Sequence, residues 1–159
     1  MSQSATAAVS PPARVRSLLL PIADAQLLLP NAAVAEIVPY MDPEPLPGAP
    51  DWMLGLFSWR ERRIPMISFE AVCGALPPPP GLRARIAVIN VLGGWQNPPF
   101  YALIIQDLPH LVQVERDGIR PLDAGITHAA VCQTVDVLGE TAHIPSLDTL
   151  EGMVRNVLA

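Results

Sequence analysis

The sequence predicts a mainly β protein of short strands, with short helices between them and one longer helix at the C-terminal end. Nineteen prolines are spread along the 159 residues, and a proline inside a helix costs about 3 kcal/mol. Short segments rich in Val, Ile and Leu alternate with turn residues, as strands and turns do. Only near the C-terminus do apolar residues recur at the spacing of three and four that marks one helix face.

The first half of the chain is predicted to form five strands, two short helices and a long loop. The strands cover residues 16–23, 26–29, 36–38, 53–59 and 64–67. Asn31 is expected to cap one or two helical turns through Val34, and Ser68 to cap a short helix through Val72. Residues 39–50 hold five prolines, so they form an extended loop.

The second half repeats this pattern and ends in a helix. Its strands cover residues 85–91, 100–105, 111–115, 129–137 and 141–144. Their Val and Ile content and their regular spacing point to a barrel. The helix covers residues 147–158, where Ser146 or Asp148 is expected to be the cap and Glu151 to complete a capping box.

Two segments are expected to connect or precede the folded units. Residues 77–80 are four consecutive prolines, which predicts a stiff spacer between two half-units. Residues 1–14 are rich in Ser and Ala and are expected to form a disordered tail. Tighter turns are predicted at residues 61–63 and at Gly93 and Gly94.

Charge and hydropathy exclude two classes of partner. All ten basic residues are Arg, the net charge is −5, and no basic run is longer than residues 60–63, which Glu61 interrupts. Phosphate binding needs a basic stripe, so nucleic acid is not an expected partner. Residues 86–106 carry no charge, but the glycines and prolines among them would break a membrane-spanning helix. The apolar run at residues 18–20 is too short for a secretory signal, so we expect a cytoplasmic protein without membrane insertion.

The sequence contains no catalytic or metal-binding motif. Its three histidines are scattered, and no phosphate-binding or nucleophile-elbow pattern occurs. Cys73 and Cys132 lie in apolar surroundings and are expected to be buried structural thiols. A nucleophile pair of Cys132 and His143 can be drawn, but nothing nearby suggests an oxyanion hole. We expect no enzyme activity, metal or cofactor.

An aromatic cluster around one arginine is the strongest binding signal. Trp52, Phe57 and Trp59 surround Arg60 in sequence, and Glu36 lies in an earlier strand. An arginine that stacks on aromatic rings and pairs with a carboxylate is a common way to build a specific protein surface. The alternative interpretation is that the tryptophans belong to the core or its rim and that Arg60 is a solvated charge.

Several ordered motifs resemble the CheW-like domain of chemotaxis coupling proteins over residues 16–158. Residues 34–37 follow the family's V-x-E-I segment, and residues 55–69 follow its G-x-x-N-x-R-G-x-x-x-P-V-I-D-L pattern. In the latter, Arg60 falls on the family's arginine and Pro65 on its proline. Residues 118–121 resemble the family's I-R-P turn.

The sequence also departs from the family pattern. Ser58, Glu61 and Ser68 stand where the family has Asn, Gly and Asp, and Gln106 and Asp107 occupy the place of its V-D-G acid and glycine. These departures indicate a divergent member with altered partner choice. We expect an accessory adaptor of the kind found in pilus-linked (Chp-type) chemosensory systems, which act with type IV pili.

The resemblance implies two SH3-like five-stranded β-barrels. The first would cover residues 25–80, and the second residues 82–150 together with the N-terminal strand at 16–23. It further implies a non-catalytic adaptor that couples the cytoplasmic tips of methyl-accepting chemoreceptors to the regulatory domain of a CheA-type histidine kinase, in which the groove between the barrels takes the receptor helix.

The resemblance also implies a partner-binding site in which Glu36 pairs with Arg60. The expected site residues are Val34, Glu36, Ile37, Gly55, Phe57, Trp59 and Arg60. Two alternatives remain at this point: an SH3-like module that binds a peptide partner unrelated to chemotaxis, and a small hydrolase that uses Cys132 or a histidine.

Overall fold

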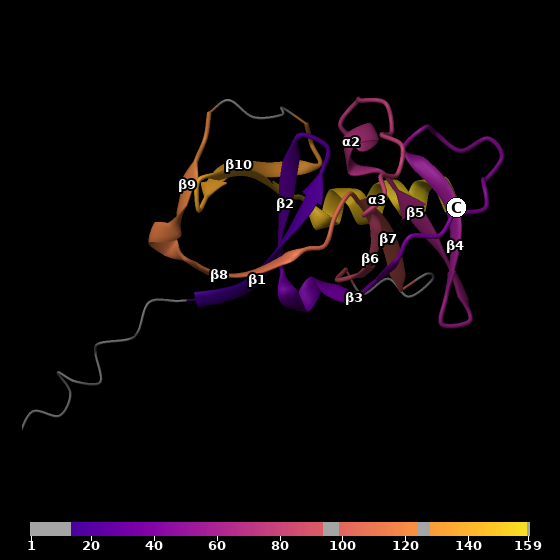
Figure 1. The fold of residues 1–159 in the computed structure, drawn as a ribbon. Helices are drawn as coiled ribbons and strands as arrows, with labels where there is room; N and C mark the ends of the chain where they lie inside the picture. The colour runs from indigo at the N-terminus through magenta and orange to yellow at the C-terminus, as the bar shows by residue number, and fades with distance from the viewer. Residues whose placement is uncertain (1–13, 94–98, 124–127, 159) are drawn as a thin grey trace, which may run out of the picture.

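The computed structural model describes residues 14–93, 99–123 and 128–158, which form two β-sheets and a few helices (Figure 1). The six-stranded sheet has the order β8-β1-β2-β11-β10-β9 and the five-stranded sheet the order β3-β6-β7-β5-β4. The mainly β class is therefore confirmed. The predicted tail, except for Arg14, and Gly94 of the predicted turn lie outside the described residues.

The strand positions agree closely with those predicted from the sequence. The six-stranded sheet contains β1 (Arg14–Ile22), β2 (Ala25–Pro30), β8 (His110–Glu115), β9 (Ile119–Pro121), β10 (Val131–Val137) and β11 (Glu140–Pro145). The five-stranded sheet contains β3 (Val34–Pro39), β4 (Met53–Trp59), β5 (Arg62–Ile67), β6 (Arg85–Asn90) and β7 (Phe100–Ile105). The helices are α2 (Phe69–Val72) and α3 (Leu147–Leu158), with the 3-10 turns η1 (Asn31–Ala33) and η2 (Arg116–Gly118).

Each sheet has its two edge strands next to each other in the chain, which curls the sheet toward a barrel. The edges β8 and β9 are joined only by η2, so the two ends of the six-stranded sheet are tied together (Figure 1). The edges β3 and β4 of the other sheet are joined by the proline-rich loop. Each sheet also contains one parallel pair, β11 with β2 and β5 with β7. The two sheets therefore close in a similar way, although one has six strands and the other five.

The sheets divide the strands differently from the predicted units. The β2 strand, predicted in the first unit, pairs with β1 in the six-stranded sheet, and β6 and β7, predicted in the second unit, lie beside β3 and β5. The reason is that β1 and β2 form one antiparallel hairpin whose strands cannot be separated between sheets. The sixth strand is β9, which pairs with β10 although its sequence was interpreted as a turn.

The largest apolar cluster lies between the two sheets and is closed by α3. Leu20 of β1, Leu103 of β7 and Leu150 and Val154 of α3 are among its buried members. The six-stranded sheet encloses a second, aliphatic cluster that includes Leu19 and the five-stranded sheet a third that contains aromatic rings. No helix in the described ranges is long and apolar enough to cross a membrane.

The helix caps are partly as predicted. Ser68 accepts a hydrogen bond from the Ala71 N–H at 3.3 Å and so caps α2. Ser146 accepts one from the Thr149 N–H at 3.3 Å, which makes Ser146 the cap of α3. The prediction for Asn31 was wrong, because Pro30 precedes a single 3-10 turn and no side chain caps it.

Two nearly buried glutamates tie each half of the molecule to the other. The predicted capping box at Glu151 was wrong, because its carboxylate accepts the Leu92 and Gly93 N–H groups at 2.9 and 3.0 Å, beyond β6 in the other sheet. Glu70 of α2 accepts the Ala23 N–H at 2.8 Å, in the turn between β1 and β2. Each helix therefore holds a hairpin connection of the opposite sheet.

Removing the Glu151 carboxylate should loosen this connection. Glu151 is 7% exposed, and its replacement leaves two N–H groups without an acceptor at a cost of about 2–3 kcal/mol. We expect Glu151→Ala to lower the free energy of unfolding by that amount in urea titrations. The exposed Glu140 of β11 is the control, because Glu140→Ala removes a carboxylate that holds no such bond; equal losses in the two variants would contradict the assignment.

Stability should also fall as the pH drops through the range where histidine titrates. Burial lowers the pKa of His143 below its ordinary value, and its Nδ1 lies 2.9 Å from the Thr134 hydroxyl. The unfolded chain then binds a proton more readily than the folded one, so this contribution is present above pH 6.5 and lost below it. His143→Asn should flatten the change in melting temperature between pH 7 and pH 5, measured by circular dichroism against the unchanged chain.

Candidate functional site

The hairpin of β4 and β5 carries the predicted arginine at its tip. Trp59 pairs with Arg62 across the hairpin, which leaves Arg60 and Glu61 as a two-residue turn. Both turn residues have left-handed backbones, with φ of 46° and 63°. This is the geometry of a type I′ hairpin turn, in which glycine is usual. The turn is thus one residue earlier than predicted, and Glu61 occupies a backbone position that suits the glycine of the family pattern.

The predicted pair of Glu36 and Arg60 forms. Arg60 Nη2 lies 3.2 Å from Glu36 Oε1, and the Trp59 indole N–H donates to the same oxygen at 2.9 Å. Glu36 lies on β3 and Arg60 follows β4, which are the two edge strands of the five-stranded sheet. The pair therefore bridges the seam where that sheet closes on itself.

Aromatic rings support the two exposed arginines of this hairpin. The Arg60 guanidinium carbon lies 4.9 Å from the Trp59 ring centroid, and that of Arg62 lies 5.8 Å from the Phe100 ring centroid. The two rings pack edge to face with their centroids 4.7 Å apart. Trp59 is only 7% exposed, so it belongs to the core, whereas the Arg60 side chain is 68% exposed. Both earlier interpretations of the cluster thus hold in part.

The structure places the other predicted site residues mostly inside the protein. Val34 and Ile37 are half-buried on β3 and pack against the cluster between the sheets. Phe57 is 3% exposed and Gly55 is buried, so neither presents a side chain to a partner. Phe57 packs in the same apolar cluster as Trp59, and Gly55 lies against the backbone of Glu44, so direct contact of these two residues with a partner stays a prediction.

The backbone conformation and surroundings of Gly55 leave no room for a side chain. Its φ is 143°, and a Cβ at this position would lie 2.2 Å from the Glu44 carbonyl oxygen. Glu44 and Leu56 exchange two backbone hydrogen bonds of 2.8 Å, which fasten the proline-rich loop along β4. Glu44 also forms an ion pair with Arg63 at 2.6 Å. Sequence reasoning missed Glu44, since nothing in the loop distinguishes it.

The junction between the two sheets contains a cleft of about 450 Å³. It is lined by the β1–β2 turn, by α2 and the residues after it, and by His143 of β11. The predicted site residues do not line it. This cleft lies at a different place from the Glu36–Arg60 pair, and the binding of a receptor helix in a groove between the barrels stays a prediction.

The geometry gives no support to thiol chemistry. Burial, and after it the charge of Glu70, raise the pKa of the Cys73 thiol, which disfavours the nucleophilic thiolate. Cys132 is exposed instead of buried, because the strand register shifts between Val131 and Gln133. His143 faces the Thr134 hydroxyl. Within the described ranges, no three His, Cys, Asp or Glu residues are grouped in a way that could hold a metal.

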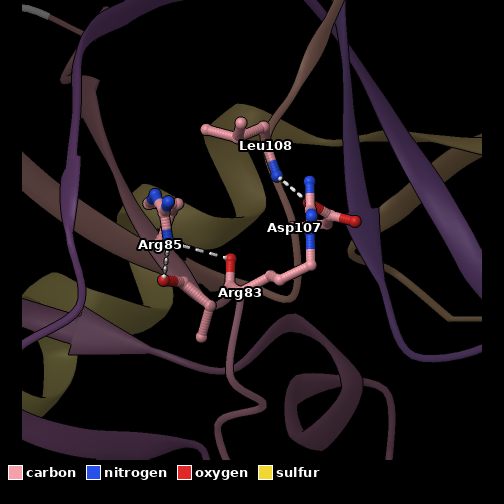
Figure 2. Close-up of polar contacts among 5 residues, drawn as sticks. Arg83, Arg85, Asp107 and Leu108 are labelled. Atoms are coloured by element: carbon pink, nitrogen blue, oxygen red, sulfur yellow. Dashed lines mark hydrogen bonds and ion pairs between the residues drawn. The ribbon is translucent and has the colours of Figure 1, made fainter.

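A further arginine–carboxylate contact lies where the family has its V-D-G acid and glycine, with Asp107 at the glycine position (Figure 2). Arg83 Nε lies 2.7 Å from Asp107 Oδ1, and the Leu108 N–H donates to the same oxygen at 2.7 Å. The bond from Arg83, and then that from Leu108, lower the pKa of the Asp107 carboxyl. The Arg85 guanidinium donates hydrogen bonds to the backbone carbonyls of Arg83 and Ala84. This contact fixes the start of β6 against the end of β7.

The sequence of this chain matches a known protein family over most of its length. A family model of the CheW-like domain matches residues 16–151, which is most of the chain. The chain belongs to the CheW-like domain family. It is accordingly a non-catalytic scaffold of chemotaxis signalling, and the hydrolase alternative is set aside.

The fold is also that of a solved CheW protein. The crystal structure of scaffolding protein TtCheW from Thermoanaerobacter tengcongensis matches with a TM-score of 0.69 and 19% sequence identity, over 84% of this chain and 90% of that one. This likeness confirms two SH3-like β units as the fold. A comparison with curated proteins gives no match.

The crowding at Gly55 predicts a large loss of stability on substitution. Gly55→Ala adds a Cβ that meets backbone 2.2 Å away, at a φ that other residues avoid, so we expect a loss of about 2–5 kcal/mol. Gly48 of the same loop has a φ of 80° but open space around its Cβ position. Gly48→Ala should therefore cost about 1 kcal/mol. Urea unfolding of both variants checks the difference, and equal costs would contradict the close approach.

Proposed function

We propose that this chain is a cytoplasmic adaptor that couples the tips of methyl-accepting chemoreceptors to the regulatory domain of a CheA-type histidine kinase. Membership of the CheW-like family supports the general class of chemotaxis scaffold. The observation that carries the finer proposal is the Glu36–Arg60 pair, which lies where the family's partner-binding residues are expected. Nucleic acid and membrane lipid are not partners in this proposal.

The energetics of the pair support a role in recognition rather than in folding. The Arg60 and Glu36 side chains are 68% and 39% exposed, and an ion pair of this kind adds at most about 1 kcal/mol to stability. The same contact fixes the direction of both charges, because Trp59 holds the carboxylate from below. A preorganised pair of opposite charges favours one partner orientation and rejects surfaces with the wrong charge pattern.

The surroundings of the pair suit a protein partner. Val34 and Ile37 are half-buried apolar neighbours of Glu36 along β3, and they pack against the cluster between the sheets. Interfaces commonly place an arginine and apolar groups together at their centre, with polar groups around them. In this proposal the receptor tip or the kinase regulatory domain covers the β3 strand and the tip of the β4–β5 hairpin, and a receptor helix occupies the cleft at the sheet junction.

Arg60→Ala and Glu36→Ala should each weaken partner binding without unfolding the protein. We expect affinity for the receptor tip or the kinase regulatory domain to fall about tenfold, a change of about 1.4 kcal/mol. Calorimetric titration with purified receptor and kinase fragments of the same organism measures this. Arg83→Ala is the matched control, since Arg83 is a 69% exposed arginine in an ion pair on another surface. Affinities equal to that of the unchanged chain would remove Glu36 and Arg60 from the interface.

The alternative function is an SH3-like module for a peptide partner unrelated to chemotaxis. Peptide grooves of that type expose their aromatic rings to the ligand, whereas Trp59 is 7% exposed. The burial of Trp59 disfavours this alternative. It would gain support if the chain bound neither receptor nor kinase but captured proline-rich peptides, and if Trp59→Ala abolished that capture.

A further inference from the structure

Three arginines lie at the end of the β4–β5 hairpin, and two of them already have a carboxylate. Arg60 pairs with Glu36 at 3.2 Å and Arg63 with Glu44 at 2.6 Å. Arg62, between them in sequence, is exposed and contacts the Phe100 ring. Among the described residues it forms no ion pair. Its neighbour Glu61 is exposed at the turn and does not bridge to it.

Arg62 is nevertheless held in place. Its guanidinium carbon lies 5.8 Å from the Phe100 ring centroid, and Phe100 packs on Trp59, whose ring supports Arg60. Two guanidinium groups therefore share one pair of touching rings but only one carboxylate. Stacking on a ring restricts the side chain and leaves the N–H groups at the guanidinium edge available for hydrogen bonds.

We propose that Arg62 receives a carboxylate from the polypeptide that covers the Glu36–Arg60 pair. A planar guanidinium fixed on a ring matches a carboxylate with two parallel hydrogen bonds, which gives geometric specificity as well as attraction. The inference rests on the proposed function, because it assumes that a partner binds at this hairpin. It adds the chemistry of the partner: an acidic residue that lies against the Phe100 side of the hairpin.

The negative charge of the neighbouring Glu61 allows the charge of the partner group to be tested. Glu61 would repel an incoming carboxylate, so removal of its charge should strengthen binding, whereas removal of the Arg62 charge should weaken it. A basic partner group would reverse both effects. Arg63 is the matched control on the same strand, because Glu44 already occupies its guanidinium.

The experiment titrates the full chain with the receptor cytoplasmic fragment and the kinase regulatory domain of the same organism, at low and at high salt. Arg62→Gln is expected to weaken binding to one of these about tenfold and to reduce its dependence on salt, as loss of a charge contact does. Arg62→Lys should bind more tightly than Arg62→Gln but more weakly than the unchanged chain, because lysine keeps the positive charge but cannot donate two parallel hydrogen bonds. Glu61→Gln should tighten binding two- to fivefold, and Arg63→Gln should change it less than twofold.

The outcomes separate this inference from the function on which it rests. Binding by the unchanged chain, with Arg62→Gln within twofold of it, would overturn the inference and leave the proposed function standing. Stronger binding by Arg62→Gln together with weaker binding by Glu61→Gln would also overturn it and indicate a basic partner group. If the unchanged chain bound neither fragment, the proposed function and the inference would fall together. Circular dichroism of each variant shows that a loss of affinity does not come from unfolding.

Discussion

The apolar cluster between the two sheets is the interaction on which the rest of the structure depends. It takes strand residues from both sheets and the buried face of α3, so this cluster forms only when both sheets are present. Burial of aliphatic side chains is the main favourable term in folding, and here it also fixes one sheet against the other. The glutamates of α2 and α3 then fix the orientation of the two sheets, because each accepts hydrogen bonds from N–H groups in a strand connection of the opposite sheet.

The candidate site depends on this arrangement through the edge strands of the five-stranded sheet. Its edges β3 and β4 approach each other as the sheet curls, and Glu36, Trp59 and Arg60 meet across that seam. The buried Trp59 ring fixes the orientation of the Glu36 carboxylate and the Arg60 guanidinium. The type I′ turn at the hairpin tip requires left-handed backbones at Arg60 and Glu61, a conformation that is unfavourable elsewhere in the chain.

Strand positions could be predicted from the sequence, whereas their grouping into sheets could not. Val- and Ile-rich segments between turn residues report local conformation, but the pairing of β2 with β11 joins segments more than a hundred residues apart. The burial of Phe57 could have been predicted from the sequence, because alternate residues of β4 face inward. Glu151 likewise falls beside Leu150 on the apolar face of α3, a buried polar position that signals a bond. The strand β9 was missed because three residues ending in proline resemble a turn.

The places of the strands along the chain affect the order in which the two sheets can assemble as the chain is synthesised. All five strands of one sheet lie between Val34 and Ile105, so this sheet is complete before the last third of the chain exists. The β1–β2 hairpin is made first, yet its partners β8 and β11 are made only after all strands of the five-stranded sheet. Contacts between distant segments slow folding. The first hairpin therefore meets its partner strands late, and its side chains in the cluster between the sheets can pack on the five-stranded sheet before those strands are made.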